Sequence, residues 1–182
     1  MVILKNIFKS EIFEYAKIII IALVISLLVR TYVAEARFIP SESMLPTLKI
    51  GDRLIVDKLF YEINGSKDIQ RGDIIVFDPP PAAKSRNDIP FIKRVIGLPG
   101  ETISINKGTV YINGEPLSEP YISEKPVGSF NPFVIPDGTI FLMGDNRNNS
   151  NDSRFWGPLP LRNIIGVAEF RFYPLNEMGV LD

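Results

Sequence analysis

The pattern of hydrophobic residues divides the chain into an apolar N-terminal stretch and a longer remainder. Residues Ile18–Val29 are almost all apolar, and aromatic and aliphatic residues extend the stretch on both sides. A membrane-spanning helix needs about 20 such residues, and the long side chains of Lys17 and Arg30 can reach the two headgroup layers. The pattern predicts one membrane-spanning helix over residues 12–33, preceded by a short N-terminal segment, 1–11.

A secretory signal that is cleaved after translocation is the alternative interpretation of this stretch. Lys5 and Lys9 would form its basic end, and Ala34-Glu35-Ala36 has the small-residue pattern of a cleavage site. We favour a retained anchor because the stretch is slightly long for a signal sequence, and cleavage there would leave Ser43 close to a free end. The basic residues on the two sides differ little in number, so charge gives only a slight preference for a cytoplasmic N-terminus.

The remainder of the chain consists of short β-branched runs separated by Gly, Pro, Asn and Asp, which is typical of strands joined by turns. We expect strands at residues 53–56, 74–77, 91–96, 102–105, 109–112, 139–143 and 167–172. Residues 106–108 and Asn113-Gly114 have the composition of hairpin turns. The body is therefore predicted to be mostly β. The Pro-, Ser- and Gly-rich segment 118–136 suggests that the hairpins from about Thr102 onward form a small inserted lobe.

Composition narrows the chemistry that this body can perform. The 20 basic and 21 acidic side chains nearly balance, so no basic face for nucleic acid is expected. The chain has neither histidine nor cysteine, which excludes a Ser-His-Asp triad, a cysteine nucleophile and thiolate metal ligands. A serine nucleophile would need a lysine as its base, and no metal or cofactor is called for.

Ser43 is the candidate nucleophile. It follows the strand-like residues 36–40 and lies in a turn bounded by Pro40 and Pro46. Taken alone, such a serine-rich turn is more often only a turn. Ser41, two residues earlier, would be placed to help the backbone N–H of Ser43 bind an oxyanion.

Lys93 is the candidate base, because it lies between Ile92 and Val95 in a predicted strand that is mostly apolar. A free lysine has a pKa of about 10.4, and burial can lower this pKa by several units. Successive strand residues point to opposite faces, so Arg94 should contribute little to the shift. The alternative is a lysine on the solvent face of an edge strand.

The most polar segment of the chain runs from Gly144 to Gly157. Arg147 stands where a calcium loop needs an oxygen ligand, and no glutamate closes the loop, so calcium is not expected. A long hairpin loop is the plain interpretation. The catalytic interpretation has Ser150 bonding the lysine amine and Asp152 pairing with Arg154.

Together, these segments resemble the type I signal peptidases, also called leader peptidases, which are membrane-bound Ser-Lys serine proteases. The stretch Ser43-Met-Leu-Pro-Thr47 is similar to the family's nucleophile box, and Gly51-Asp52-Arg53 to the structural box after it. Residues 93–100 are similar to the base box and residues 144–154 to the last box, in the family's order. The single span resembles the compact bacterial form.

The resemblance implies a role for each candidate residue. Ser43 would be the nucleophile and Lys93 the general base, with Ser41 Oγ and the Ser43 N–H binding the oxyanion. Ser150 would orient the lysine amine. Two ion pairs would frame the site: Asp145 with Arg94, and Asp152 with Arg154.

The family fold is also implied: coiled antiparallel sheets of the signal-peptidase and LexA-like type, with a small β lobe inserted in the catalytic core. Here the core would comprise residues 34–101 and 138–182, and the insert residues 102–137.

A protein of this family would remove N-terminal signal peptides from translocated preproteins, cutting after small residues at positions −1 and −3. Apolar side chains near Ser43 would line the substrate pockets: Ile39, Pro40, Met44, Leu48, Phe91 and Ile92. The catalytic domain would face the periplasm, the cell exterior or a thylakoid-type lumen. Expected partners are secretory preproteins, the nearby translocon, and membrane lipids that touch Phe38, Met44 and Leu45.

Two alternatives differ from this interpretation. A self-cleaving repressor resembling LexA would carry a DNA-binding domain where this chain has an apolar stretch. A catalytically silent, membrane-anchored β module would bind preproteins or the translocon without cutting them. The presence of both Ser43 and Lys93 argues against the silent module.

Overall fold

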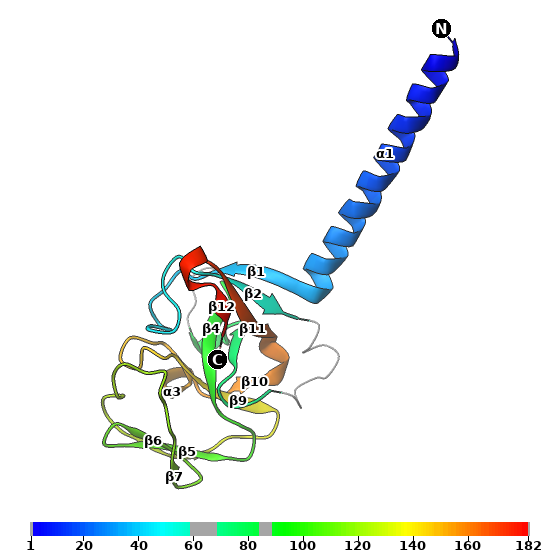
Figure 1. Cartoon of the computed structure of the whole chain (residues 1–182). Coiled ribbons are helices and arrows are strands. Elements are labelled where there is room, and N and C mark those ends of the chain that lie inside the picture. The colour runs from blue at the N-terminus through cyan, green and yellow to red at the C-terminus, as the bar shows by residue number, and fades with distance from the viewer. Residues whose placement is uncertain (1, 59–68, 84–88, 182) are drawn as a thin grey trace.

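The structure, a computed structural model, describes residues 2–58, 69–83 and 89–181, with side chains from Phe13 onward. Helix α1 (Val2–Leu28) continues through a π-helical turn (Val29–Val33) and projects from a β domain as a single rod (Figure 1). Residues 13–33 have a mean hydropathy of 2.2, and none of this segment is buried in the protein. At 1.5 Å per residue the segment is about 31 Å long, close to the thickness of a bilayer core. By length and composition, α1 can cross a membrane.

Eight strands form the larger sheet of the β domain. Their order is β1-β2-β11-β3-β4-β9-β10, with β12 beside β11, and neighbouring strands are antiparallel. The strands are β1 (Ala34–Phe38), β2 (Arg53–Asp57), β3 (Ile74–Phe77), β4 (Phe91–Gly97), β9 (Thr139–Met143), β10 (Leu159–Pro160), β11 (Ile164–Tyr173) and β12 (Gly179–Val180). The long strand β11 shifts register against both β2 and β3, and such bulges bend a strand, so the sheet curls.

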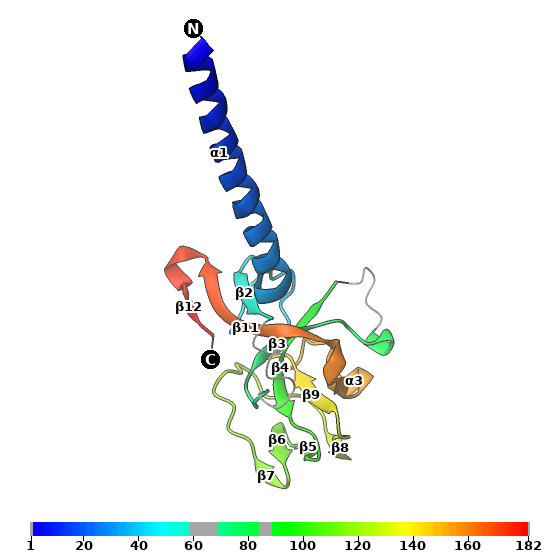
Figure 2. The ribbon, with the colours of Figure 1, turned by 90° about the vertical axis from the view of Figure 1, so that its right-hand side faces the viewer.

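A second, four-stranded sheet has the order β7-β6-β5-β8. Its strands are β5 (Thr102–Asn106), β6 (Thr109–Ile112), β7 (Glu115–Pro116) and β8 (Phe130–Val134). Lys107 and Gly108, which join β5 to β6, both have positive φ, as a two-residue hairpin turn requires. The sheet lies at the end of the molecule opposite α1 (Figure 2). All four strands fall within residues 102–137, which we keep as the proposed bounds of the inserted lobe.

Short helices complete the described chain: η3 (Pro81–Ala83), α3 (Ser153–Trp156), η4 (Leu161–Asn163) and η5 (Leu175–Glu177). The mostly β fold with one N-terminal apolar helix is confirmed, and each of the seven predicted runs lies in an observed strand.

The hydrophobic core places β4 at the centre of the domain. Residues Ile92–Gly97 are all buried, because β4 lies between β3 and β9 and is covered on both faces. One cluster unites Ile92 with residues of β2 and β3, a second includes Val95, and a third joins Ile96 to the small sheet. Any polar side chain on this strand is therefore held away from water.

Candidate active site

The turn between β1 and β2 carries Ser43. Its neck is closed by two backbone hydrogen bonds, Ile39 N–H to Asp52 O at 2.9 Å and Gly51 N–H to Ile39 O at 3.0 Å. Met44 and Leu48 anchor the turn, because both are fully buried in the first hydrophobic cluster. Ser43 itself is only 8% exposed. The nucleophile candidate thus stands on a fixed support.

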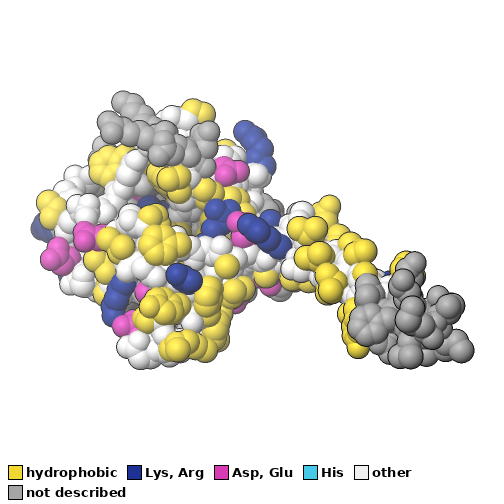
Figure 3. Space-filling model, turned by 90° about the horizontal axis from the view of Figure 1, so that it is seen from above, with side chains coloured by type: hydrophobic (Ala, Val, Ile, Leu, Met, Phe, Trp, Pro, Cys, Tyr) yellow, Lys and Arg dark blue, Asp and Glu magenta, His cyan; other side chains and the backbone are white. Residues whose placement is uncertain are grey.

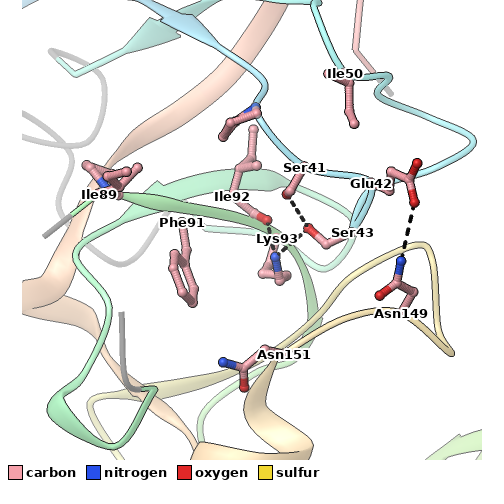
Figure 4. Close-up of a pocket in the computed structure, with 12 residues that line it drawn as sticks. Ser41, Glu42, Ser43, Ile50, Ile89, Phe91, Ile92, Lys93, Asn149 and Asn151 are labelled. Carbon is pink, nitrogen blue, oxygen red and sulfur yellow. Dashed lines mark hydrogen bonds between the residues drawn. The ribbon is translucent and has the colours of Figure 1, made fainter. Parts of the chain in front are cut away.

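Lys93 approaches Ser43 from the middle of β4, where it pairs with Ile75 of β3. Its Nζ lies 2.7 Å from Ser43 Oγ and donates to the carbonyl oxygen of Ile92 at 2.9 Å (Figure 4). The side chain is buried, so it is not a lysine on the solvent face of an edge strand.

Burial changes the acid-base behaviour of this amine. Desolvation lowers the pKa of Lys93 to about 8, against the opposing attraction of the Asp152 and Asp145 carboxylates. At pH 7 this shift raises the neutral fraction of the amine by roughly 300-fold. A neutral amine has a lone pair that can accept the Ser43 hydroxyl proton, so the pair can act as nucleophile and base.

The two serines expected to assist the pair are placed differently. Ser41 Oγ lies 3.3 Å from Ser43 Oγ, on the open side of the site. Ser150 Oγ is buried and, within the described residues, has no hydrogen-bond partner. The expected bond between Ser150 and Lys93 is therefore not formed in the structure, and the Ile92 carbonyl takes its place.

Two buried ion pairs involve Arg94, which follows Lys93 in β4, and the polar segment after β9. Arg94 donates from Nε and Nη2 to Asp145, at 2.9 and 2.8 Å, and both side chains are almost fully buried. The Asp152 carboxylate receives Arg154 Nε at 2.8 Å and the Gly144 N–H at 3.0 Å. It also caps the one-turn helix α3 through the Arg154 N–H. The polar segment after β9 is thus a compact loop and helical turn, held by charged hydrogen bonds.

This loop touches the nucleophile turn directly. The Asn146 N–H donates to Ser43 O at 3.1 Å, and Thr47 Oγ1 donates to Asp145 Oδ2 at 2.6 Å. A Cβ on Gly144 would overlap the carbonyl oxygen of Ser43 and the Oγ of Ser150. Gly144 is therefore needed for this close approach, which the sequence alone does not reveal.

A cavity of about 570 Å³ opens in front of the dyad. Three of the six residues expected to line the substrate pockets lie along this cavity: Pro40, Phe91 and Ile92. Ile39, Met44 and Leu48 do not, because they are buried in the core behind Ile92. The lining residues that sequence reasoning missed are Glu42, Ile50, Ile89, Pro90, Asn149 and Asn151. Figure 4 shows Ile89 and Phe91 on one side of Ser43, and Glu42 and Asn149 on the other.

We also searched the described residues for side chains that could bind a metal ion. Among the described residues, no group of three or more His, Cys, Asp or Glu side chains gathers as ligands.

Comparison with known proteins identifies the family of this chain. Residues 12–173 match the profile of signal peptidase, peptidase S26. The chain belongs to this family. It is 52% identical to signal peptidase I of Leptolyngbya laminosa over 94% of this chain and 85% of that protein. It is also 52% identical to a probable signal peptidase I-1 of Synechocystis sp., over 92% and 86% of the two chains.

More distant signal peptidases also match over most of their length. The signal peptidase I of Bacillus licheniformis is 38% identical over 96% of this chain and 95% of that protein. A crystal structure of a signal peptidase I from Enterococcus faecalis V583 has a TM-score of 0.48 and 37% identity, covering 56% of this chain and 97% of that one. By its family, the protein is a serine peptidase that hydrolyses peptide bonds.

Proposed function

We propose that this peptidase removes N-terminal signal peptides from preproteins, with Ser43 as nucleophile and Lys93 as general base. The buried 2.7 Å contact between Lys93 Nζ and Ser43 Oγ carries the proposal. The lowered pKa of Lys93, about 8, supports it, because it provides a neutral amine near physiological pH. The names of the relatives point to the same activity.

The chemistry proceeds in two halves. Neutral Lys93 takes the proton from Ser43 Oγ while that oxygen attacks the carbonyl carbon before the cut, and Ser41 Oγ and the Ser43 N–H stabilise the oxyanion. The lysine ammonium then protonates the leaving nitrogen, the C–N bond breaks, and an ester remains on Ser43. A water molecule, deprotonated by Lys93, hydrolyses this ester and releases the signal peptide.

An open sheet edge offers a place for the substrate. Residues 91–93 of β4 pair with β3, but the pairing of β4 with β9 begins only at Arg94. An extended peptide can add to this edge beside Lys93, and alternate side chains would then meet the wall formed by Pro40, Phe91 and Ile92. This geometry supports a requirement for small residues at positions −1 and −3.

The membrane sets where the reaction takes place. We propose that α1 crosses the bilayer with its N-terminus in the cytoplasm and holds the catalytic domain on the trans side, near the translocon. Figure 3 looks onto the face from which α1 leaves the domain, where apolar side chains are exposed among charged ones. Phe38 is 57% exposed and can touch lipid, but Met44 is fully buried, so its expected contact with lipid is wrong.

The test uses the full chain in detergent micelles with a preprotein substrate. Ser43→Ala and Lys93→Arg should each abolish cleavage, the latter because a guanidinium stays protonated throughout the pH range of the assay and cannot act as a base. Ser118→Ala, which removes an exposed serine that does not line the cavity, should cut like the wild type. Near-normal turnover by either dyad variant would refute the proposal. A wild-type chain that binds the preprotein without cutting it would be the silent module.

A further inference from the structure

The connection between β7 and β8 contains a segment, Glu119–Lys125, that belongs to the inserted lobe but contacts the catalytic core. It packs against the loop Gly144–Asn149, which follows β9. None of its residues lines the cavity in front of the dyad. Its contacts with the core are therefore not contacts with substrate.

Glu119 makes the strongest of these contacts. Its carboxylate accepts from Arg147 Nη1 at 2.9 Å and Nη2 at 2.6 Å, and both side chains are almost completely buried. Arg147 in turn donates from Nε to the carbonyl oxygen of Gly144 at 3.2 Å. A two-pronged ion pair has one favoured geometry. Glu119 thus holds the Arg147 guanidinium in place, and this guanidinium in turn holds the carbonyl group of Gly144.

Tyr121 makes a second contact, with the two guanidinium groups of Arg94 and Arg147. Its ring centroid lies 4.1 Å from the guanidinium carbon of Arg94 and 5.9 Å from that of Arg147. A guanidinium at this distance is attracted to the face of an aromatic ring. Burial raises the pKa of Tyr121 to about 12, so its hydroxyl remains neutral, and it donates to Glu119 Oε1 at 3.3 Å. The ring therefore covers the guanidinium of Arg94, which is paired with Asp145.

The other side of the same loop holds the nucleophile turn. Gly144 packs directly on the Ser43 carbonyl, the Asn146 N–H donates to it, and Asp145 accepts from Thr47. The loop is thus clamped between the inserted lobe on one side and the Ser43 turn on the other. A displacement of the loop by a fraction of an ångström would move the backbone of Ser43.

We infer that Glu119 and Tyr121 are positioning residues of the peptidase, through which the inserted lobe holds the Gly144–Arg147 loop against the Ser43 turn. The inference rests on the proposed function of the dyad. A buried ion pair is a poor source of stability, since an apolar pair of similar volume often does as well. The pair of Glu119 and Arg147 is instead suited to fixing a geometry. Its loss should slow the chemical step and leave substrate affinity unchanged.

The experiment compares Glu119→Gln and Tyr121→Leu with Glu124→Gln. The control removes an exposed carboxylate of the same segment, which contacts the same loop at Asn148. Cleavage of a signal-peptide substrate by the full chain in detergent should show kcat lowered about 10- to 100-fold in the first two variants, with KM within twofold, since small misplacements of reacting groups have effects of this size. The control should match the wild type in both constants.

A double variant separates positioning from stability. In Glu119→Gln/Arg147→Met no buried charge is left unpaired, so the midpoint of urea unfolding should recover toward the wild-type value. Its kcat should stay low, because the contact with the Gly144 carbonyl is still missing. Recovery of kcat together with stability, or a rise in KM alone, would overturn the inference.

Amide hydrogen exchange does not depend on cleavage, so it tests the role of Glu119 separately from the proposed function. Hydrogen exchange at the Asn146 amide, which reports its bond to Ser43 O, should be at least tenfold faster in Glu119→Gln and unchanged in Glu124→Gln. Unchanged exchange in both variants would overturn the inference even if the wild type cuts. If the wild type does not cut but hydrogen exchange changes as expected, the proposed function is wrong. The contact between Glu119 and the loop is then still established.

Discussion

Replacing Lys93 by methionine tests the physical basis of the proposed dyad. Methionine is similar in length and apolar, so it removes the buried amine with little change in packing. Burial lowers the pKa of Lys93 from 10.5 to about 8. Each pKa unit corresponds to about 1.4 kcal/mol, so keeping the protonated amine in the folded protein costs about 3 kcal/mol at pH 7.

The sign of the pH dependence follows from this shift. The unfolded chain binds the proton of Lys93 more tightly than the folded chain does. The free-energy cost of holding the protonated amine in the folded protein is therefore fully present below pH 8. It disappears as the pH rises toward 10.5. The variant also loses the hydrogen bonds of the amine to Ser43 and Ile92, each contributing about 1 kcal/mol. We expect Lys93→Met to be about 1 kcal/mol more stable than the wild type at pH 7 and about 2 kcal/mol less stable at pH 10.5.

Urea unfolding in detergent, followed by the fluorescence of Trp156, measures this difference. Trp156 is the single tryptophan of the chain and packs 5.9 Å from Phe77 in the second hydrophobic cluster. Lys125→Met, which removes an exposed lysine, should show no comparable change with pH. A difference between Lys93→Met and the wild type that stays constant from pH 7 to 10.5 would refute the idea that burial lowers this pKa.

Three further predictions concern catalysis. The kcat/KM of the wild type should rise with pH through an apparent pKa near 8, since the proposed base is the neutral form of Lys93; a rise centred above pH 10 in a rate profile would contradict this. Gly144→Ala should lower kcat about 100-fold, because its Cβ would displace Ser43. Gly179→Ala, which faces open space, should have no effect, and equal rates for the two variants would rule out the close approach as a requirement. In a peptide series, phenylalanine or leucine at −1 or −3 should stop cleavage while −2 tolerates both, and equal tolerance at all three positions would exclude the strand-like binding mode.

The strands could be predicted from sequence because their β-branched runs and turn residues are local signals. Strand β8 was missed for a physical reason: its sequence, Phe130-Asn-Pro-Phe-Val134, contains a proline and an asparagine that are typical of loops. It becomes a strand because β5 supplies its partner, in an irregular register. Strands β7, β10 and β12 have two residues each, too few to show any alternation.

In the site, too, residues in local motifs could be predicted from the sequence, and contacts that form only in the folded chain could not. Ser43 and Lys93 stand in recognisable local motifs, but Glu119 lies 28 residues from Arg147, and nothing in its neighbourhood marks it as a partner. The path of the β1–β2 turn decides that Pro40 faces the cavity while Ile39 faces the core. The Ile92 carbonyl, which accepts from the Lys93 amine, is a backbone group and has no sequence signature.

The direct connection between the helix and the β domain limits the distance between the end of the helix and Ser43. The π-helical turn ends at Val33 and β1 begins at Ala34, already paired with Asp57 of β2, so no slack chain separates the two. Strand β1 spans about 17 Å at 3.3 Å per residue, and Ser43 follows it by five positions. If α1 crosses the bilayer as proposed, Ser43 is held at one height above it, and cleavage takes place at that height. A signal peptide too short or too long to present its bond at that height would escape, whatever its side chains.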